Sequence, residues 1–258
     1  MLIGEFSDLQ WTAMLVIGMG AGLIHGFVGI GFPLIATPLF ALLFGFQRAV
    51  PILVLPTLLL VFCTFVAFGR AIDPREAFRR YWPLLLMSPI GVVLGTRALF
   101  LMDTRLLMLM LAVVIGVFLA LDWRSRTRIA LVSRHPTAFA FPVGLLAGFC
   151  EGTVNVSGPM LLIFFLLLEL EAGAIIAAMN YLFLLGKVVQ SGALAAHGAF
   201  DRGVWQAAIP LGLVSAAMFF VGVRLRARFD PASYRAWLKL TLGVMAMLLM
   251  IRVATSST

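Results

Sequence analysis

The stretch AGLIHGFVGIGFP at residues 21–33 decides how this sequence is read, because it interrupts an apolar segment. Three glycines and Pro33 follow His25, and both residue types weaken a continuous helix. Inside a lipid bilayer such irregular backbone is tolerated where protein encloses it or where it lines a cavity. The stretch therefore predicts a break in a helix that has a functional reason.

A second stretch, AGFCEGTVNVSGP at residues 147–159, repeats the first at an offset of 126 residues. The two stretches share Ala, Gly, Gly, Val and Pro at identical positions. Farther along, GTRALFLMD at 95–103 matches GVRLRARFD at 222–230 in its Gly, Arg and Asp, now at an offset of 127. Matching blocks in the same order predict an internal duplication.

The composition indicates a polytopic membrane protein. Of the 258 residues, 62% are hydrophobic and 12% are charged, whereas soluble domains average about 45–50% and about 25%. The N-terminal sequence MLIGEFSDLQW lacks the basic region and the cleavage site of a removable signal peptide. Apolar runs, many near the roughly 20 residues that cross a bilayer, recur at 10–29, 33–46, 49–69, 82–101, 106–122, 138–150, 159–170, 173–196, 204–223 and 236–253.

Three of these runs, 33–46, 138–150 and 159–170, are too short to span comfortably. Each is joined to a neighbour through a Gly, Pro or polar break, which predicts helical hairpins in place of plain crossings. We therefore expect an all-α membrane protein of two inverted repeats. Each repeat would contain a broken or re-entrant hairpin and about three transmembrane helices. The expected divisions are a first repeat at 1–122, a basic cytoplasmic linker at 123–137 and a second repeat at 138–258.

The net charge of +8 comes from arginines between the apolar runs. This excess is typical of cytoplasmic loops, so no nucleic-acid partner is expected. The loop at 70–80 would lie inside, while its repeat partner near 197–203 would lie outside. The two halves would then cross the membrane in opposite senses, with both termini outside, in the periplasm. The three clusters are Arg70, Arg75, Arg79 and Arg80; Arg124, Arg126, Arg128 and Arg134; and Arg224, Arg226, Arg228 and Arg235.

Each predicted break opens into a short helix that begins near a proline, Pro33 or Pro159. Proline is well suited to the first helical turn. The N–H groups at a helix N-terminus carry partial positive charge and favour an anion. Two such ends facing each other near the bilayer midplane predict a site for a small anionic substrate. Close helix packing through small residues is the alternative explanation of the glycines.

His25 and Glu151 occupy equivalent positions in the duplication and form the predicted proton-coupling pair. Structural hydrogen bonds across the hairpins are the alternative. Lys187, in the middle of an apolar run, could neutralise an anion or pair with Glu151, and Thr57 and Thr64 have weaker claims. No catalytic residue, metal or cofactor is expected. The predicted substrate-binding residues are Gly29, Ile30, Gly31, Phe32, Pro33, Asn155, Ser157, Gly158, Pro159, Asn180 and Lys187.

The duplicated glycine-rich hairpin and the two halves around a basic linker resemble the sulfite exporter TauE/SafE family over essentially the whole chain. The resemblance implies a bacterial inner-membrane permease for sulfite, for sulfonates such as sulfoacetate, or for other small organic anions. Phe32 stands where the family usually has glycine, and TVNVS at 153–157 replaces a more glycine-rich run. The motif residues carried over are Gly29, Gly31, Pro33, Gly152, Ser157, Gly158 and Pro159.

The leading functional hypothesis is a secondary transporter of a small anion, with proton coupling and alternating access. A passive anion channel, an importer or a carboxylate permease of the same architecture is the nearest alternative. A remote alternative is an intramembrane serine protease using Ser157 and His197, and a purely structural scaffold is another. The expected partners are the lipid bilayer and the anion, and a homodimer is possible. Cys63 and Cys150 fall in apolar runs and are expected to be small core residues.

Overall fold

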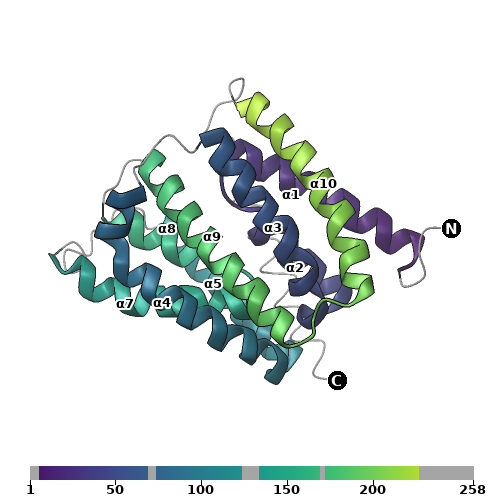
Figure 1. Ribbon diagram of the computed structural model, residues 1–258, viewed down its shortest axis with the longest axis horizontal. Helices are drawn as coiled ribbons and strands as arrows, with labels where there is room; N and C mark the ends of the chain where they lie inside the picture. Colours follow the sequence, from purple (N-terminus) through teal and green to yellow (C-terminus); the bar gives the residue numbers. More distant parts are fainter. Residues whose placement is uncertain (1–5, 69–73, 124–133, 169–171, 227–258) are drawn as a thin grey trace.

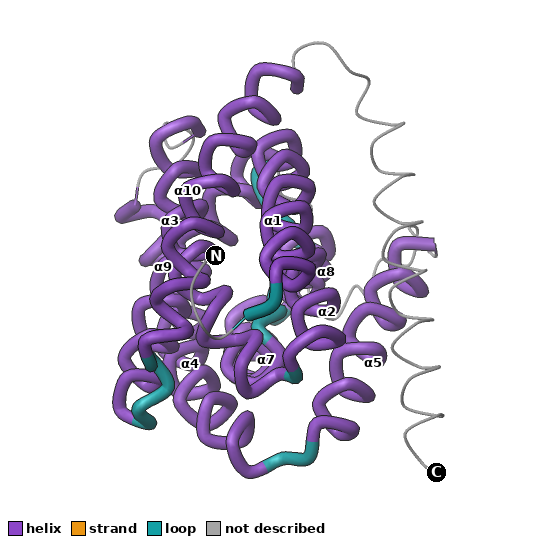
Figure 2. The backbone as a smooth tube through the Cα atoms, turned by 90° about the vertical axis from the view of Figure 1, so that its right-hand side faces the viewer, coloured by secondary structure: helices purple, strands orange, loops and turns teal. Residues whose placement is uncertain are grey.

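The computed structural model describes residues 6–68, 74–123, 134–168 and 172–226, and this part of the chain is helical without strands (Figure 2). The expected all-α fold is therefore confirmed there. The side chains of 74–81, 118–123 and 172–173 are outside the description. The helices are α1 (Asp8–Val28), α2 (Phe32–Phe44), α3 (Phe46–Phe68), α4 (Pro74–Leu101), α5 (Thr104–Trp123), α7 (Pro136–Val154), α8 (Gly158–Leu167), α9 (Ala172–Ala196) and α10 (Arg202–Leu225).

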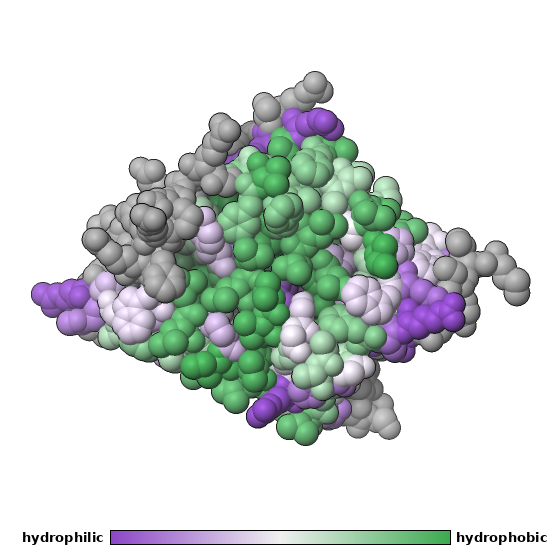
Figure 3. Space-filling view, viewed as in Figure 1, coloured by the Kyte–Doolittle hydropathy of each residue, from purple (hydrophilic) through white to green (hydrophobic). Residues whose placement is uncertain are grey.

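Six of the described helices, α1, α3, α4, α7, α9 and α10, contain an apolar stretch long enough to cross a membrane. Their outward faces keep large apolar side chains exposed, among them Phe62 and Val66 of α3 and Leu213 of α10. Apolar residues cover the middle of the face drawn in Figure 3, and hydrophilic residues gather toward its edges. A multi-pass membrane protein accounts for this surface, because lipid takes the place of water around the middle of the molecule.

The helices form two outer pairs around a central pair (Figure 1). Helices α1 and α10 lie side by side on one flank, and α4 and α7 lie side by side on the other. Between the flanks α3 packs on α9, while α10 contacts α3 and α4 contacts α9. Each outer pair thus joins one helix from the first half of the chain to one from the second.

Glycines allow close approach within the two outer pairs. A Cβ built on Gly22 would overlap the backbone of Ser215, and a Cβ built on Gly148 would overlap the backbone of Ser88. Small residues that bring helix backbones together are a common way of packing membrane helices. Along α1 the residues Gly18, Gly22 and Gly26 face Leu211, Ser215 and Phe219 of α10, and along α7 the residues Gly144, Gly148 and Gly152 face Leu84, Ser88 and Val92 of α4.

These two sets of contacts are equivalent residue by residue. The glycines are related by 126 residues and their partners by 127, which are the offsets that the sequence matches show. Within each pair the contacts advance in the same direction along both helices, so each pair is parallel. Close helix packing, the alternative explanation of the glycines, is therefore what these six glycines show, and the duplicated sequence corresponds to duplicated packing.

Helices α1 and α2 form a hairpin. Phe6, just before α1, contacts Phe44 at the end of α2 with ring centroids 5.6 Å apart. The chain therefore enters with α1 and returns with α2 to the same end of the molecule. In the second half, Phe139 near the start of α7 and Leu167 at the end of α8 pack against one apolar cluster.

The start of α1 lies at the same end of the molecule as the α2–α3 and α9–α10 connections. Arg48 at the start of α3 lies 3.9 Å from Asp201, the N-cap of α10, and over the ring of Phe6. The ring of Phe100, near the end of α4, stacks on His197, just after α9, at 5.0 Å and 15°. The loops after α4 and α9 thus lie on the same side.

The opposite end holds the starts of α4 and α7, where the rings of Trp82 and Phe141 meet at 5.4 Å. Consequently α1 and α7, which occupy equivalent positions in the duplication, run in opposite directions. The two inverted repeats remain a prediction, and this arrangement supports them. Three predicted features lie outside the described residues: the last apolar run at 236–253, most of the linker at 123–137, and part of the basic loop at 70–80.

Candidate functional site

The first break is shorter than the sequence indicates. Helix α1 continues to Val28 and ends at Gly29, whose φ of 90° is left-handed. Gly31, with φ 121°, is the N-cap of α2, and Pro33 lies in the first turn of that helix. Glycine adopts both positive angles without the steric cost that a Cβ imposes. The two glycines therefore reverse the chain between α1 and α2 within three residues.

His25 is buried at 1% exposure and connects this break to α3. The Phe32 N–H donates to His25 Nδ1 at 3.1 Å, and His25 Nε2 lies 3.0 Å from Thr64 Oγ1. The Thr64 hydroxyl donates to the Leu60 carbonyl oxygen at 2.9 Å, so it accepts a hydrogen bond from the ring. These bonds assign the neutral tautomer with the proton on Nε2. In a doubly protonated ring the Nδ1–H would point at the Phe32 N–H, and two donors cannot form a hydrogen bond.

The second break has the same layout. Helix α7 ends at Val154, Asn155 takes the left-handed conformation with φ 62°, and α8 begins at Gly158. Asn155 is the equivalent of Gly29, and it tolerates this backbone region better than most residues with a Cβ. Asn155 N–H donates to the Glu151 carbonyl at 3.1 Å, as Gly29 N–H donates to the His25 carbonyl at 2.7 Å.

Glu151 caps the start of α8. Its Oε2 accepts a hydrogen bond from the Ser157 N–H at 3.1 Å and another from the Ser157 hydroxyl. The sequence predicts free N–H groups at the starts of the two short helices. In this conformation two of the N–H groups there, those of Phe32 and Ser157, are bound by the residues at the equivalent positions 25 and 151.

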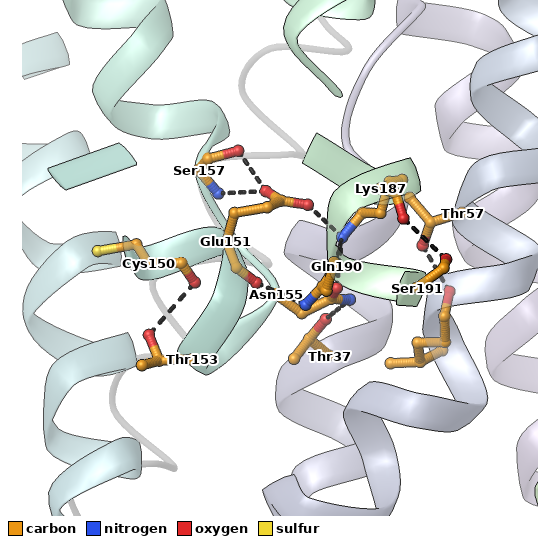
Figure 4. A network of polar contacts seen from close by, with 11 residues as sticks. Thr37, Thr57, Cys150, Glu151, Thr153, Asn155, Ser157, Lys187, Gln190 and Ser191 are labelled. Carbon is orange, nitrogen blue, oxygen red and sulfur yellow. Dashed lines mark hydrogen bonds and ion pairs between the residues drawn. The ribbon is translucent and has the colours of Figure 1, made fainter. Parts of the chain in front are cut away.

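A lysine from α9 completes a buried charged centre around Glu151 (Figure 4). Lys187 is 0% exposed and Glu151 is 3% exposed. Lys187 Nζ forms an ion pair with Glu151 Oε1 and donates to Asn155 Oδ1 and to Gln190 Oε1, the last at 2.8 Å. Gln190 Nε2 in turn donates to the Glu151 carbonyl at 2.8 Å. The structure thus shows the predicted pairing of Lys187 with Glu151.

Two asparagines connect the two halves of the chain at this level. Asn155 Nδ2 donates to Thr37 Oγ1 of α2 at 3.0 Å. Asn180 Nδ2, on α9, donates to the Ile176 carbonyl at 2.7 Å and approaches the Gly29 carbonyl at 3.4 Å. Both breaks therefore lie against polar groups of the opposite half. Asn180 Oδ1 is buried without a hydrogen-bond partner among the described residues.

The remaining predicted substrate-binding residues have different surroundings. The Phe32 side chain is 0% exposed and packs in the apolar core beside Ile35 and Phe40. A Cβ built on Gly31 would meet open space, whereas Gly29 faces Ile176 of α9. The others lie at the breaks or in the first turns of α2 and α8: Ile30, Pro33, Gly158 and Pro159.

Sequence reasoning did not identify the roles of Thr37 and Gln190. Both are polar residues on buried faces of apolar helices, at 0% exposure. That pattern is the available signal, since polar groups inside a membrane protein usually have a partner. The equivalence of Gln190 and Thr64, 126 residues apart, is a second signal.

The serine-protease pair does not form. Ser157 is bonded to Glu151 inside the molecule. His197 is exposed, bonds the Ala193 carbonyl at 2.8 Å and stacks on Phe100. Cys63 and Cys150 are both buried and free, in agreement with their expected role as core residues.

The family comparison agrees with this architecture. The sequence model of the family described as Sulfite exporter TauE/SafE matches residues 14–252, nearly the whole chain. No curated protein and no solved structure matches the chain. The match includes both glycine breaks, the lysine of α9 and the helices that hold them. A chain matched over this length belongs to the TauE/SafE sulfite exporter family.

Proposed function

We propose that this protein is a secondary transporter that binds a small anion at the centre formed by Glu151, Ser157 and Lys187. The observation that carries the proposal is the fully buried Lys187, held against the break before α8. A charge inside a membrane protein is costly and marks a transport pathway more often than a structural contact. The start of α8 adds donors and a favourable partial charge at the same place.

The family indicates a membrane transporter of sulfur compounds. A sulfur oxyanion or an organosulfonate such as sulfoacetate is accordingly the proposed substrate. The three oxygens on its sulfur can accept several hydrogen bonds. The donors at the site are the ammonium group of Lys187, the hydroxyl of Ser157 and the side-chain amide of Asn155. The proposed location is the bacterial inner membrane with both termini in the periplasm. For the N-terminus, the shared end of Phe6, Arg48 and Asp201 supports this, because the loop near 197–203 is the one expected outside.

Proton coupling is proposed to act through Glu151, because a carboxylate can bind a proton and this one is held by a charge that an anion would also seek. His25 is proposed as the neutral counterpart in the other half, where it fixes the start of α2. Alternating access would follow from movement of one outer helix pair, α1 with α10, against the other, α4 with α7, around α3 and α9. The opposite directions of α1 and α7 support such an arrangement.

The direct test is uptake of radiolabelled sulfoacetate and sulfite into proteoliposomes. The double variant Lys187→Met, Glu151→Gln removes both charges, so neither is left buried without a partner, which alone would cost about 3–5 kcal/mol. We expect it to fold and to lose at least about tenfold in uptake rate, a barrier increase of about 1.4 kcal/mol.

The matched control is Ser215→Ala, which removes a buried hydroxyl of α10 that has no hydrogen-bond partner in the described part of the chain. It should transport at the wild-type rate. Wild-type uptake by a folded double variant would contradict the proposed site.

A further inference from the structure

The carboxylate of Glu151 occupies the position that an anionic substrate would take. Oε2 accepts from the backbone N–H and the hydroxyl of Ser157, and Oε1 faces the ammonium group of Lys187. A carboxylate is a planar oxyanion with one negative charge, and these three donors surround it as they would surround a bound ligand. The site is built from buried side chains and is filled by a group of the protein itself.

Lys187 has no donor to spare in this arrangement. An ammonium group has three N–H donors. Those of Lys187 are directed to Glu151, Asn155 and Gln190. A second anion can reach the ammonium group only if one of these partners leaves, and Glu151 is the partner that carries a charge. Asn155 and Gln190 are additionally tied to Thr37 and to the Glu151 carbonyl.

The charges that face Glu151 are balanced. Among the described contacts, Lys187 of α9 is the charged group against it, and Cys150 beside it on α7 is the other titratable group. At the start of α8, the Ser157 hydroxyl bonds Glu151. Val92 of α4 is the apolar neighbour, because Val92 Cγ2 and Glu151 Cγ both lie within 4 Å of a Cβ built on Gly186 of α9.

The described residues of the first half hold no second centre of this kind. Val61 stands at the position equivalent to Lys187, and the neutral ring of His25 stands at the position of Glu151. The described parts of α2 and α3 therefore place no cation at the level of the first break, since Arg48 of α3 lies at the other end of the α1–α2 hairpin, beside Phe6 and Asp201. One charged centre predicts one anion per protein chain.

We propose that Glu151 is a tethered anion that competes with the transported anion for Ser157 and Lys187, so that a proton binds to Glu151 as each anion enters. This rests on the proposed function. The protonated carboxyl group is neutral, and the incoming anion then balances the positive charge of Lys187. The buried centre then keeps zero net charge in both states, which avoids the cost of an unpaired buried charge. A monovalent oxyanion, such as bisulfite or a simple alkanesulfonate, fits this exchange with one proton. A dianion, such as sulfoacetate or fully ionised sulfite, needs a second proton to leave the centre neutral.

The test is calorimetric titration of the purified protein with methanesulfonate, whose single charge is constant over the working pH range. Titrations in two buffers of different protonation enthalpy give the number of protons taken up. The wild type should take up about one proton per anion, and its affinity should rise about tenfold for each unit fall in pH. Sulfate, with two charges, should bind more weakly.

Glu151→Gln should bind methanesulfonate without proton uptake and with an affinity independent of pH. The double variant Lys187→Met, Glu151→Gln should not bind it. Anion binding by the wild type without proton uptake, or uptake retained in Glu151→Gln, would overturn the competition and leave the transport site standing. Failure of methanesulfonate, sulfate and sulfoacetate to bind both the wild type and Glu151→Gln would overturn the site itself and the competition with it. The number of protons that the wild type takes up per anion tests the competition even if a variant does not fold.

Discussion

His25 and Glu151 show how one position in a duplicated chain supports two different tasks. Each lies in the last turn of its helix and binds an N–H at the start of the next helix: His25 that of Phe32, the first residue of α2, and Glu151 that of Ser157, the N-cap of α8. His25 does so with a neutral ring whose other nitrogen is held by Thr64. Glu151 does so with a charge and holds Lys187 as well. The shared task is structural, and the charge of Glu151 is what the second half adds.

Replacement of His25 separates these tasks. His25→Ala leaves the buried Phe32 N–H without its acceptor, so we expect a loss of about 1–3 kcal/mol in the free energy of unfolding. His25→Asn restores an acceptor close to the Nδ1 position and should recover part of the loss. Thermal unfolding in detergent measures both changes.

Transport in His25→Asn should keep the wild-type pH profile, because the ring acts as a neutral clamp. A shift of that profile would show instead that His25 carries the coupled proton.

The sequence predicts the chemistry of this centre better than its connections. Glu151 and Lys187 are visible because charges are rare in apolar runs, and the pairing of the two is one of the stated alternatives. Thr37 is not identified, since a threonine in a membrane helix commonly bonds its own backbone. The free N–H groups expected at the breaks are bound because a side chain one or two turns earlier can reach forward across the turn. That contact depends on the turn geometry, which the sequence does not give.

At the scale of helices, the ends are the feature that sequence reasoning places least well. The apolar run at 138–150 is judged too short to span, but α7 extends over Pro136–Val154 and is long enough. The polar residues that follow the run, Glu151 and Thr153, remain helical. Thr153 bonds the Phe149 carbonyl at 2.7 Å, and Glu151 reaches forward to Ser157. Their side chains are satisfied inside the protein, so the helix ends at Asn155, where the backbone turns left-handed.

The outer helix pairs depend on glycines whose removal should separate the backbones. Gly22→Ala places a Cβ against the backbone of Ser215, which cannot move as a flexible side chain would. We expect a loss of about 1–3 kcal/mol in stability, measured by thermal unfolding.

Gly20→Ala is the matched control for this substitution, because it lies on the same helix with nothing within 4 Å of its added Cβ. It should be neutral or stabilising by up to about 1 kcal/mol. Equal losses in the two variants would argue against close backbone packing of α1 on α10.

For the molecule as a whole, the two halves of the chain exchange helices. Helix α10 of the second half packs on α1 of the first, and α4 of the first half packs on α7 of the second. Movement of one half relative to the other therefore cannot separate the chain into its N-terminal and C-terminal parts. We expect the two parallel pairs to move as units. The breaks before α2 and α8 both contact α9, through Asn180 and Lys187. The sequence predicts the duplication and the opposite directions of the halves, while the exchange of helices between them comes from the structure.

The central claim is that anion movement and proton binding at Glu151 are linked, and simultaneous recording of both fluxes in proteoliposomes tests it most directly. With methanesulfonate supplied outside, we predict anion uptake that is driven by an inward proton gradient, with about one proton entering per anion. In Glu151→Gln the anion should still cross, and the gradient should no longer drive it. Wild-type anion uptake that is unchanged when the proton gradient is imposed or collapsed would contradict the account.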